Sequence, residues 1–317
     1  MSEITIVTAY FDINRKSWKG FERDNNKYIN YFKFWARIQN NLIIYTSKEF
    51  ADTIYSIRKN FGLENKTYVV AIDDVFLCDK EIYQRMKKVM CNDILLKFHF
   101  PKEIKRPNAW NVNYNYITYL KPYFVNKAIK DYNLKNLVAW WDFGFNHGGE
   151  LGILDPNDFN FLWQYNFPPK IHLFSTNYYK VLEKNRPIFD MVRAIDSYIV
   201  GGLIVAPSIL WNDLTELVRT SMLSLTRCGL CEADELVFLM SYYEKPELFI
   251  LHDVDFWYDG VRKFGGEHLK VKKEKPFHKY YQIYKYRAHI LWNYGYYKLA
   301  WKYLKKYLKY KIKGSLI

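Results

Sequence analysis

Strand-like and helix-like patterns of apolar residues alternate at the beginning of the chain. Short runs rich in β-branched and aromatic residues predict buried strands, and amphipathic stretches between them predict helices. In chain order these segments occupy residues 4–11, 25–39, 42–46, 48–61 and 67–72. Strands that alternate with helices pair in parallel through right-handed crossovers, so we predict an open α/β sheet. Because ligands of such sheets bind beyond the carboxyl ends of the strands, the segments after Thr8, Thr46 and Ile72 should share one edge.

The middle of the chain contains one further strand signal of particular interest. Residues 75–135 are mainly helical in pattern, and the run 137–141 then predicts a strand that leads directly into Asp142-Phe143-Gly144-Phe145-Asn146-His147-Gly148-Gly149. A carboxylate followed by small, flexible residues lets a ligand approach the backbone closely. Later strands are expected at 170–174, 197–205 and 248–251, and a helix that begins with acidic residues is expected at 231–243.

The composition is that of a globular protein with an excess of aromatic residues. The chain has 317 residues, of which 50% are hydrophobic and 25% charged, and it shows no internal repeat. Disordered, fibrous and solenoid classes are therefore excluded. Aromatic residues make up 19% of the chain, so some of them should lie on a surface that contacts sugars, lipid headgroups or a partner chain.

The positive charge is concentrated at the end of the chain. The formal net charge is +14, but residues 275–317 hold eleven Lys and Arg residues and no Asp or Glu, which leaves +3 for residues 1–274. We therefore expect a domain at residues 1–270 and a basic, aromatic helical tail at 271–317. On a helical wheel the lysines from Lys298 to Lys313, apart from Lys311, fall within a wedge of about 100°, and tyrosine, tryptophan and leucine residues occupy much of the remainder.

That tail has three interpretations. A basic wedge beside an aromatic and aliphatic face suits a helix that lies on an anionic membrane surface. The alternatives are a helix that packs on the body with a solvated basic edge, and a nucleic-acid binder that stacks tyrosine on bases. We expect the membrane surface and no nucleic acid, since no acidic residue interrupts the tail and the near-neutral body offers no matching groove.

The expected location is cytoplasmic, on the inner face of the cytoplasmic membrane. The opening Met1-Ser2-Glu3-Ile4-Thr5 lacks the pattern of a secretion signal, and the longest apolar stretch, 198–211, is too short and too interrupted for a membrane helix. One Cys-x-x-Cys, at Cys228 and Cys231, has no second pair or His-x-x-x-His beside it. Ordinary semi-buried thiols are therefore expected there rather than a zinc site or redox pair.

Two sets of acidic residues are candidates for chemistry. Asp142, at a strand end, suits the anchoring of a divalent cation and a diphosphate, although a turn-forming aspartate explains the same pattern. Asp234 and Glu235, with the pair Gly201-Gly202 earlier in the chain, suit general acid or base chemistry at a sugar, although simple helix capping also places acids there. His252 and Asp255 follow a late strand and are candidates to complete a metal site that Asp142 begins, the alternative being a satisfied loop histidine.

The segments at residues 5–13, 42–46, 140–144, 201–202 and 233–235 resemble, in order, those of the WlaTC/HtrL/YibB-like family of bacterial envelope-polysaccharide loci. The resemblance spans roughly residues 4–262. It implies a GT-A-like, Rossmann-type open sheet with flanking helices and a glycosyltransferase activity.

The resemblance also implies roles for particular residues. Thr8, Ala9 and Tyr10 would hold the base and ribose of the nucleotide, and Asn115 and Lys121 would face the donor. Asp142 would take the place of the Asp-x-Asp metal motif, and Gly201-Gly202 with Asp234 and Glu235 would border the sugar and acceptor. The chain departs from the motif at Gly144, where a second aspartate is missing, so either the loop supplies a single metal ligand or the site works without metal. His252 and Asp255 are the candidates for the missing ligand.

We therefore expect a glycosyltransferase that moves a sugar from a nucleotide-sugar donor to a surface polysaccharide or lipid-linked glycan of capsule or lipopolysaccharide biosynthesis. UDP is the expected nucleotide of the donor, and Mn²⁺ or Mg²⁺ the expected cofactor. Departure of a nucleoside diphosphate builds negative charge, which a cation or basic side chains must neutralise. The alternative from another class is a non-catalytic scaffold of the same fold that binds a glycan or a partner enzyme at the membrane, and the missing second aspartate favours it.

Overall fold

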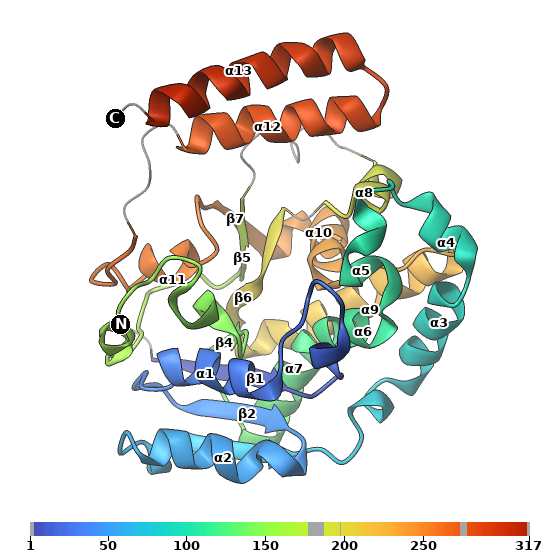
Figure 1. The fold of residues 1–317 in the computed structure, drawn as a ribbon. Helices are drawn as coiled ribbons and strands as arrows, with labels where there is room; N and C mark the ends of the chain where they lie inside the picture. Colours follow the sequence, from blue (N-terminus) through green and yellow to red (C-terminus); the bar gives the residue numbers. More distant parts are fainter. Residues whose placement is uncertain (1–2, 177–186, 197, 273–277, 316–317) are drawn as a thin grey trace. The chain divides into compact units, whose positions relative to one another are not determined.

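A seven-stranded mixed sheet forms the centre of the first part of the chain (Figure 1). The computed structural model describes residues 3–176, 187–196, 198–272 and 278–315. These residues divide after Lys270 into two compact units. The first unit holds the sheet and its helices, and the second holds the two helices of the tail.

The strands run in the order β3-β2-β1-β4-β6-β5-β7 across the sheet. Their bounds are β1 Ile4–Tyr10, β2 Leu42–Thr46, β3 Thr67–Ala71, β4 Leu137–Trp141, β5 Ile171–Ser175, β6 Ile199–Pro207 and β7 Phe249–Asp253. Every residue of β2 and β4 is buried, as expected for central strands covered on both faces. The predicted open α/β sheet is confirmed, and each observed strand lies within two residues of its expected bounds.

One strand departs from the parallel pattern. β1 pairs in parallel with both β2 and β4, but β6 runs antiparallel to β4 and β5. In the β4–β6 register Trp141 lies opposite Leu203, and the backbone N–H of Asp142 donates to the carbonyl of Gly202 at 2.9 Å. The reversed direction of β6 therefore brings the start of that strand to the edge at which β1 and β4 end.

Helices flank the sheet and continue into the tail. Their bounds are α1 Asn25–Trp35, α2 Lys48–Lys59, α3 Lys80–Met90, α4 Asp93–Phe98, α5 Pro107–Trp110, α6 Val112–Tyr119, α7 Lys121–Tyr132, α8 Ile188–Ala194, α9 Trp211–Arg227, α10 Asp234–Glu244, α11 Asp259–Arg262, α12 His278–Asn293 and α13 Tyr297–Ser315. α7 packs on β1 and β4, α10 packs on β6, and α9 packs against both helices. The region 75–135 is mainly helical, as predicted.

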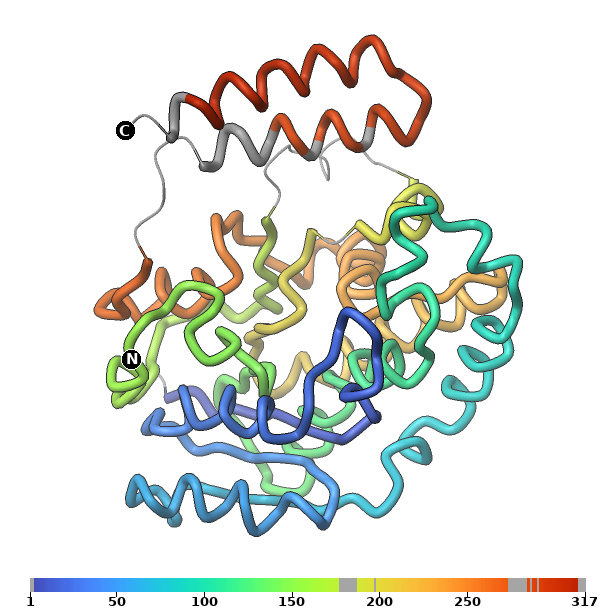
Figure 2. Tube along the Cα trace, in the orientation of Figure 1, coloured from blue at the N-terminus to red at the C-terminus, as the bar shows by residue number. Residues whose placement is uncertain are grey.

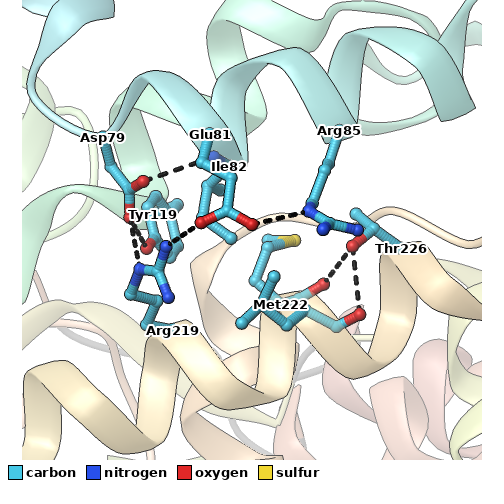
Figure 3. Close-up of polar contacts among 9 residues, drawn as sticks. Asp79, Glu81, Ile82, Arg85, Tyr119, Arg219, Met222 and Thr226 are labelled. Atoms are coloured by element: carbon cyan, nitrogen blue, oxygen red, sulfur yellow. Dashed lines mark hydrogen bonds and ion pairs between the residues drawn. The ribbon is translucent and has the colours of Figure 1, made fainter.

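Polar contacts fix α9 to the helical region between β3 and β4 (Figure 3). Arg219 donates from Nε to Asp79 at 3.0 Å and from a terminal nitrogen to Glu81 at 2.5 Å. Tyr119 donates its hydroxyl to the same Asp79 carboxylate at 2.8 Å, and Arg85 pairs with Glu81 at 3.0 Å. These contacts hold α3, α6 and α9 together, and α6 leads directly into α7, the helix that begins with Lys121.

The tail forms a helical hairpin. α12 and α13 run side by side in opposite directions, as the trace in Figure 2 shows. Tyr284 of α12 contacts the rings of Tyr303 and Tyr310 of α13, with centroid distances of 6.2 and 5.4 Å. Within the described part of the chain no helix is both long and apolar enough to cross a membrane.

Candidate functional site

A pocket of about 210 Å³ opens at the carboxyl edge of β1 and β4. Its wall includes Ala9, Tyr10, Asp12, Arg15, Arg23, Asn25, Tyr28, Tyr114, Lys121, Trp140, Asp142, Phe143, Gly144, His147, Gly202, Asp234, Glu235 and Trp257. A second hollow of about 280 Å³ shares part of that wall, including Arg15, Arg23, Asp142 and Glu235, and extends to Leu151, Val200 and Tyr258. The site therefore has two adjoining chambers that meet at Asp142 and Glu235.

Aromatic packing fixes the loop that carries Asp142. The ring of Phe143 stacks on Phe32 of α1 at 4.6 Å and on Tyr10 of β1 at 4.8 Å. The indole of Trp35 stacks on Trp141 and donates to the carbonyl of Phe143 at 3.1 Å. Because the residues on both sides of Asp142 are held in the core, its carboxylate has a set position at the pocket wall.

Lys121 lies at the centre of the acidic side of the pocket. Its ammonium contacts Asp142 Oδ1 at 2.9 Å, Asp234 Oδ2 at 2.8 Å and the carbonyl of Gly201 at 2.8 Å. The side chain is 7% exposed, and burial by itself lowers the pKa of an ammonium, but the two carboxylates raise the pKa of Lys121 above its ordinary value. One buried cation thus faces two carboxylates, so the formal charge of this side of the pocket is negative. Burial raises the pKa of Asp234, and the ammonium of Lys121 opposes that rise.

The glycine pair of β6 lets α10 approach the sheet. A Cβ on Gly201 would lie 2.2 Å from Asp234 Oδ2 and 3.0 Å from Glu235 Cγ, so a side chain there would displace the start of α10. At Gly202 the nearest atom, Asp142 Oδ2, would lie 3.5 Å from a Cβ, which is ordinary contact. Burial, followed by the charges of Glu235 and Asp234, raises the pKa of Tyr114, which keeps its phenol protonated beside them.

Not all of the residues expected to bind the nucleotide-sugar donor line the pocket. Ala9, Tyr10, Lys121, Asp142 and Gly202 line it, whereas Gly201 contributes its carbonyl to Lys121 from just behind the wall. Thr8 is fully buried inside β1, one residue before the strand reaches the pocket. Asn115 is also fully buried, and its amide donates to the carbonyl of Asn108.

His252 and Asp255 lie away from Asp142. β7 is separated from β4 by two strands, and within it His252 faces His172, with 2.8 Å between the two ring nitrogens. Asp255 pairs with Lys263 at 3.2 Å, and neither residue lines the chambers described above. The expected shared ligand set of Asp142 with His252 or Asp255 is therefore not assembled, because strand order rather than sequence distance decides which loops meet.

A protein-only metal centre is also missing from the described residues, where no three His, Cys, Asp or Glu side chains form a group that could hold a metal ion. Cys228 is exposed and Cys231 is buried, and both are free thiols.

Asp142 is the acidic residue best placed for a cation. Lys121 and Trp140 both contact its Oδ1, and no described residue pairs with its Oδ2.

Two arginines that sequence reasoning missed form another part of the wall. Arg15 donates to the Tyr28 hydroxyl at 2.7 Å and to the Phe21 carbonyl at 3.3 Å, and its guanidinium lies 5.3 Å from the centroid of Trp18. Arg23 lies 3.3 Å from the His147 ring nitrogen. Burial, followed by the charge of Arg23, lowers the pKa of His147 to about 4, so the ring is neutral at pH 7.

The contacts of Arg15 and Arg23 are therefore with neutral groups, and neither arginine forms an ion pair with a described carboxylate. The signal that could have found them is their place in the segment between β1 and α1, directly after a strand end. Basic side chains at such an edge are well placed for an anionic ligand.

The segment after Asp142 has a strained backbone. Asn146, His147 and Gly148 all have positive φ angles, of 58°, 45° and 63°. Two hydrogen bonds between the Asn146 side chain and the backbone of Ile153 hold this conformation. Non-glycine residues in the left-handed region are unfavourable unless their surroundings impose them, and here the result is that His147 stacks on Tyr31 beside the pocket.

Comparison with known proteins gives the family of the chain. Residues 2–266 match the family model described as bacterial protein of unknown function (HtrL_YibB). The chain belongs to the HtrL/YibB family. It is 32% identical over 286 residues to the protein HtrL of Escherichia coli K12, a match that covers 86% of this chain and 96% of that protein. The matched region of this HtrL/YibB chain includes every residue of the pocket wall.

Among solved structures, the mouse xyloside xylosyltransferase 1 in its apo form is similar to this chain at 12% identity and a TM-score of 0.39. The match covers 86% of this chain and 96% of the mouse chain.

Proposed function

We propose that this HtrL/YibB-family chain is a glycosyltransferase that takes a sugar from a nucleotide-sugar donor, with UDP as the expected nucleotide. The acceptor would be a surface polysaccharide or a lipid-linked glycan. The observation that supports the proposal is the division of charge across one pocket. On one side, Arg15 and Arg23 carry positive charge that no carboxylate among the described residues pairs with. On the other side, Asp142, Asp234 and Glu235 lie around the single cation of Lys121. A nucleotide sugar has the matching division, with an anionic diphosphate beside a neutral sugar.

Each part of the donor has a suitable surface in the pocket. The guanidinium groups of Arg15 and Arg23 suit the diphosphate, because their planar forks bind phosphate oxygens and neutralise the charge that grows as the nucleoside diphosphate departs. The half-buried ring of Tyr28 offers a face for the base, and the buried ring of Tyr10 packs beside it at 5.2 Å. Asp12 and Asn25, which hydrogen-bond to each other at 2.9 Å near the end of β1, lie where the ribose hydroxyls would bind.

Lys121 and the acidic residues would act on the sugar and the acceptor. Lys121 is a positioning residue, because its hydrogen bonds hold the carboxylates of Asp142 and Asp234 at the pocket wall. Because Glu235 lines both chambers, we propose that its carboxylate orients the acceptor hydroxyl and accepts the proton of that hydroxyl. The anomeric carbon would exchange its bond to the phosphate oxygen for a bond to the acceptor oxygen, and the second chamber would hold the acceptor glycan.

A divalent cation fits this site only together with the donor. Asp142 Oδ2 is the carboxylate oxygen available for Mn²⁺ or Mg²⁺, and the phosphate oxygens of the donor would complete the ligand set. Bound in this way, the cation would add to the charge neutralisation that the two arginines begin.

Thermal unfolding of the purified chain in the presence of UDP, GDP, CMP and their sugars tests the proposal, because a ligand that binds only the folded state raises the melting temperature. We expect a selective rise with one nucleoside diphosphate and its sugars, and a smaller rise for Asp142→Ala. Equal responses to nucleotides and to inorganic pyrophosphate would instead favour the non-catalytic scaffold. An unchanged response of Asp142→Ala would remove Asp142 from the site.

A further inference from the structure

One solvent-exposed face of α13 carries three large apolar side chains. We call this set the apolar ridge, and it consists of Trp301, Leu308 and Ile312. These side chains are 51%, 45% and 59% exposed. In a regular helix they project within about 40° of one another, so they lie along one side of α13 over three turns. Three large apolar side chains in a row on a helix surface are unusual for a face that remains in water.

The packing of the hairpin does not use this ridge. Tyr303, Tyr307 and Tyr310 of α13 are half-buried, and Ala300 is 1% exposed. Tyr303 and Tyr310 contact Tyr284 of α12, and Arg287 of α12 donates to the Tyr303 hydroxyl at 3.4 Å. The aromatic residues of the tail thus separate into a set that joins the two helices and a ridge on another side of α13.

A row of lysines lies directly beside the ridge. This lysine row consists of Lys298, Lys302, Lys305 and Lys309, all exposed, which project within about 60° of one another. The row has no acidic neighbours in the sequence of the tail, because residues 275–317 contain no Asp or Glu. The positive charge of α13 is therefore concentrated next to its exposed apolar residues.

We propose that this face of α13 docks on an anionic lipid surface, with the apolar ridge in the interface and the lysine row against the headgroups. Charge complementarity selects this occupant. The rest of the chain, residues 1–274, has a formal charge of +3 and offers the tail no net attraction, whereas acidic lipid headgroups attract each lysine. Leucine and isoleucine insert among acyl chains but do not stack on bases, which disfavours a nucleic acid at the same face.

The proposal is independent of the activity proposed above, but the two are compatible. A chain held at a lipid surface by α13 would meet a lipid-linked acceptor there.

Sedimentation of the full chain with vesicles tests the docking face. One set of vesicles is phosphatidylcholine alone, and the other contains one part in three of phosphatidylglycerol. We expect the unchanged chain to bind the anionic vesicles. Its affinity for them should fall about tenfold or more in the double variant Lys302→Gln, Lys305→Gln. The triple variant Trp301→Ser, Leu308→Ser, Ile312→Ser should lose a similar amount of affinity.

Matched controls keep the test specific. The body variant Leu77→Ser, Ile94→Ser, Ile209→Ser removes three side chains that are 60%, 71% and 79% exposed, and the pair Lys87→Gln, Lys88→Gln removes two exposed body charges. Both should bind vesicles like the unchanged chain, and circular dichroism should show native helix content for all variants. The proposal would be overturned if the unchanged chain failed to bind anionic vesicles, or if the body variants lost as much binding as the tail variants. It would also be overturned if the chain bound RNA and the tail substitutions abolished that binding.

Discussion

The ammonium of Lys121 lies 2.8 Å from Asp234 Oδ2, at the point where the beginnings of α7 and α10 meet the glycine pair of β6. The same ammonium holds Asp142 at 2.9 Å. The ammonium therefore links four segments, namely the beginnings of α7 and α10, the strand β6 and the segment after β4, and it fixes both carboxylates at the pocket wall.

Removal of the buried cation should destabilise the protein strongly. Lys121→Met leaves Asp142 and Asp234 facing each other without a counter-charge, which we expect to lower the free energy of unfolding by about 3–5 kcal/mol. Urea denaturation measures this loss. The matched control is Lys127→Met on the same helix, which removes an exposed pair with Asp131 and should cost less than about 1 kcal/mol. The double variant Lys121→Met, Asp234→Asn should recover part of the loss, and no recovery would contradict the assigned pairing.

The two glycines of β6 should respond differently to alanine. Gly201→Ala places a Cβ 2.2 Å from Asp234 Oδ2, so we expect a loss of stability of about 1–3 kcal/mol and weaker nucleotide binding. In Gly202→Ala the new Cβ would lie 3.5 Å from its nearest atom, so this variant should change stability and nucleotide binding little. Thermal unfolding with and without nucleotide compares the two variants. Equal effects at both positions would mean that the approach of α10 to β6 is not what requires glycine.

The arginines should control the affinity for a diphosphate. Arg15→Gln or Arg23→Gln should weaken binding of the nucleoside diphosphate by about tenfold to a hundredfold, because each removes a charge-assisted contact. Titration calorimetry gives the affinities. Arg37→Gln is the control, since Arg37 also lies over a ring, that of Phe61, and hydrogen-bonds Asn157, but it is not part of the pocket wall. A change limited to thermal stability, with unchanged affinity, would remove the arginines from the binding site.

A divalent cation should bind only with the nucleotide. Because no three described acidic, histidine or cysteine side chains form a metal-binding group, Mn²⁺ alone should leave the melting temperature unchanged. Mn²⁺ together with the selected nucleotide should raise it above the value for the nucleotide with EDTA. Asp142→Asn should reduce that additional rise. A large rise with Mn²⁺ alone would point to a metal centre elsewhere in the chain.

Glu232 should make stability depend on pH. Burial raises the pKa of Glu232 from 4.5 to about 7, and its carboxylate accepts from Asn108 and from the backbone N–H of Ala233. A carboxyl with a raised folded-state pKa binds its proton more tightly in the folded protein, so its stabilising contribution is complete below about pH 4.5 and is lost as the pH rises through 7.

The variant Glu232→Gln should therefore be more stable than the unchanged chain at pH 8, by up to about 3 kcal/mol, and should lose this advantage at pH 5. Urea denaturation at the two pH values measures the difference. An advantage that is the same at both values would show that the carboxyl of Glu232 does not titrate on folding.

Much of the fold follows from local pattern. The runs of β-branched and aromatic residues at β1, β2, β3 and β4 predict strands because such side chains fill a buried, pleated surface, and the chain order of strand and helix predicts an open α/β sheet. Asp142 and the acids of α10 are also recognisable from the sequence, since a strand end and the first turn of a helix are local features.

Other features depend on tertiary structure. The antiparallel direction of β6 places Gly202 against Asp142, and the order of the strands keeps His252 away from it, because non-local hydrogen bonding between strands decides both. Tertiary packing buries Thr8 and Asn115 and places Arg15 at the pocket wall. The pattern of residues along the sequence does not reveal such packing. The sequence by itself therefore determined the elements and the acidic candidates, whereas long-range pairing and packing decided which side chains share the pocket.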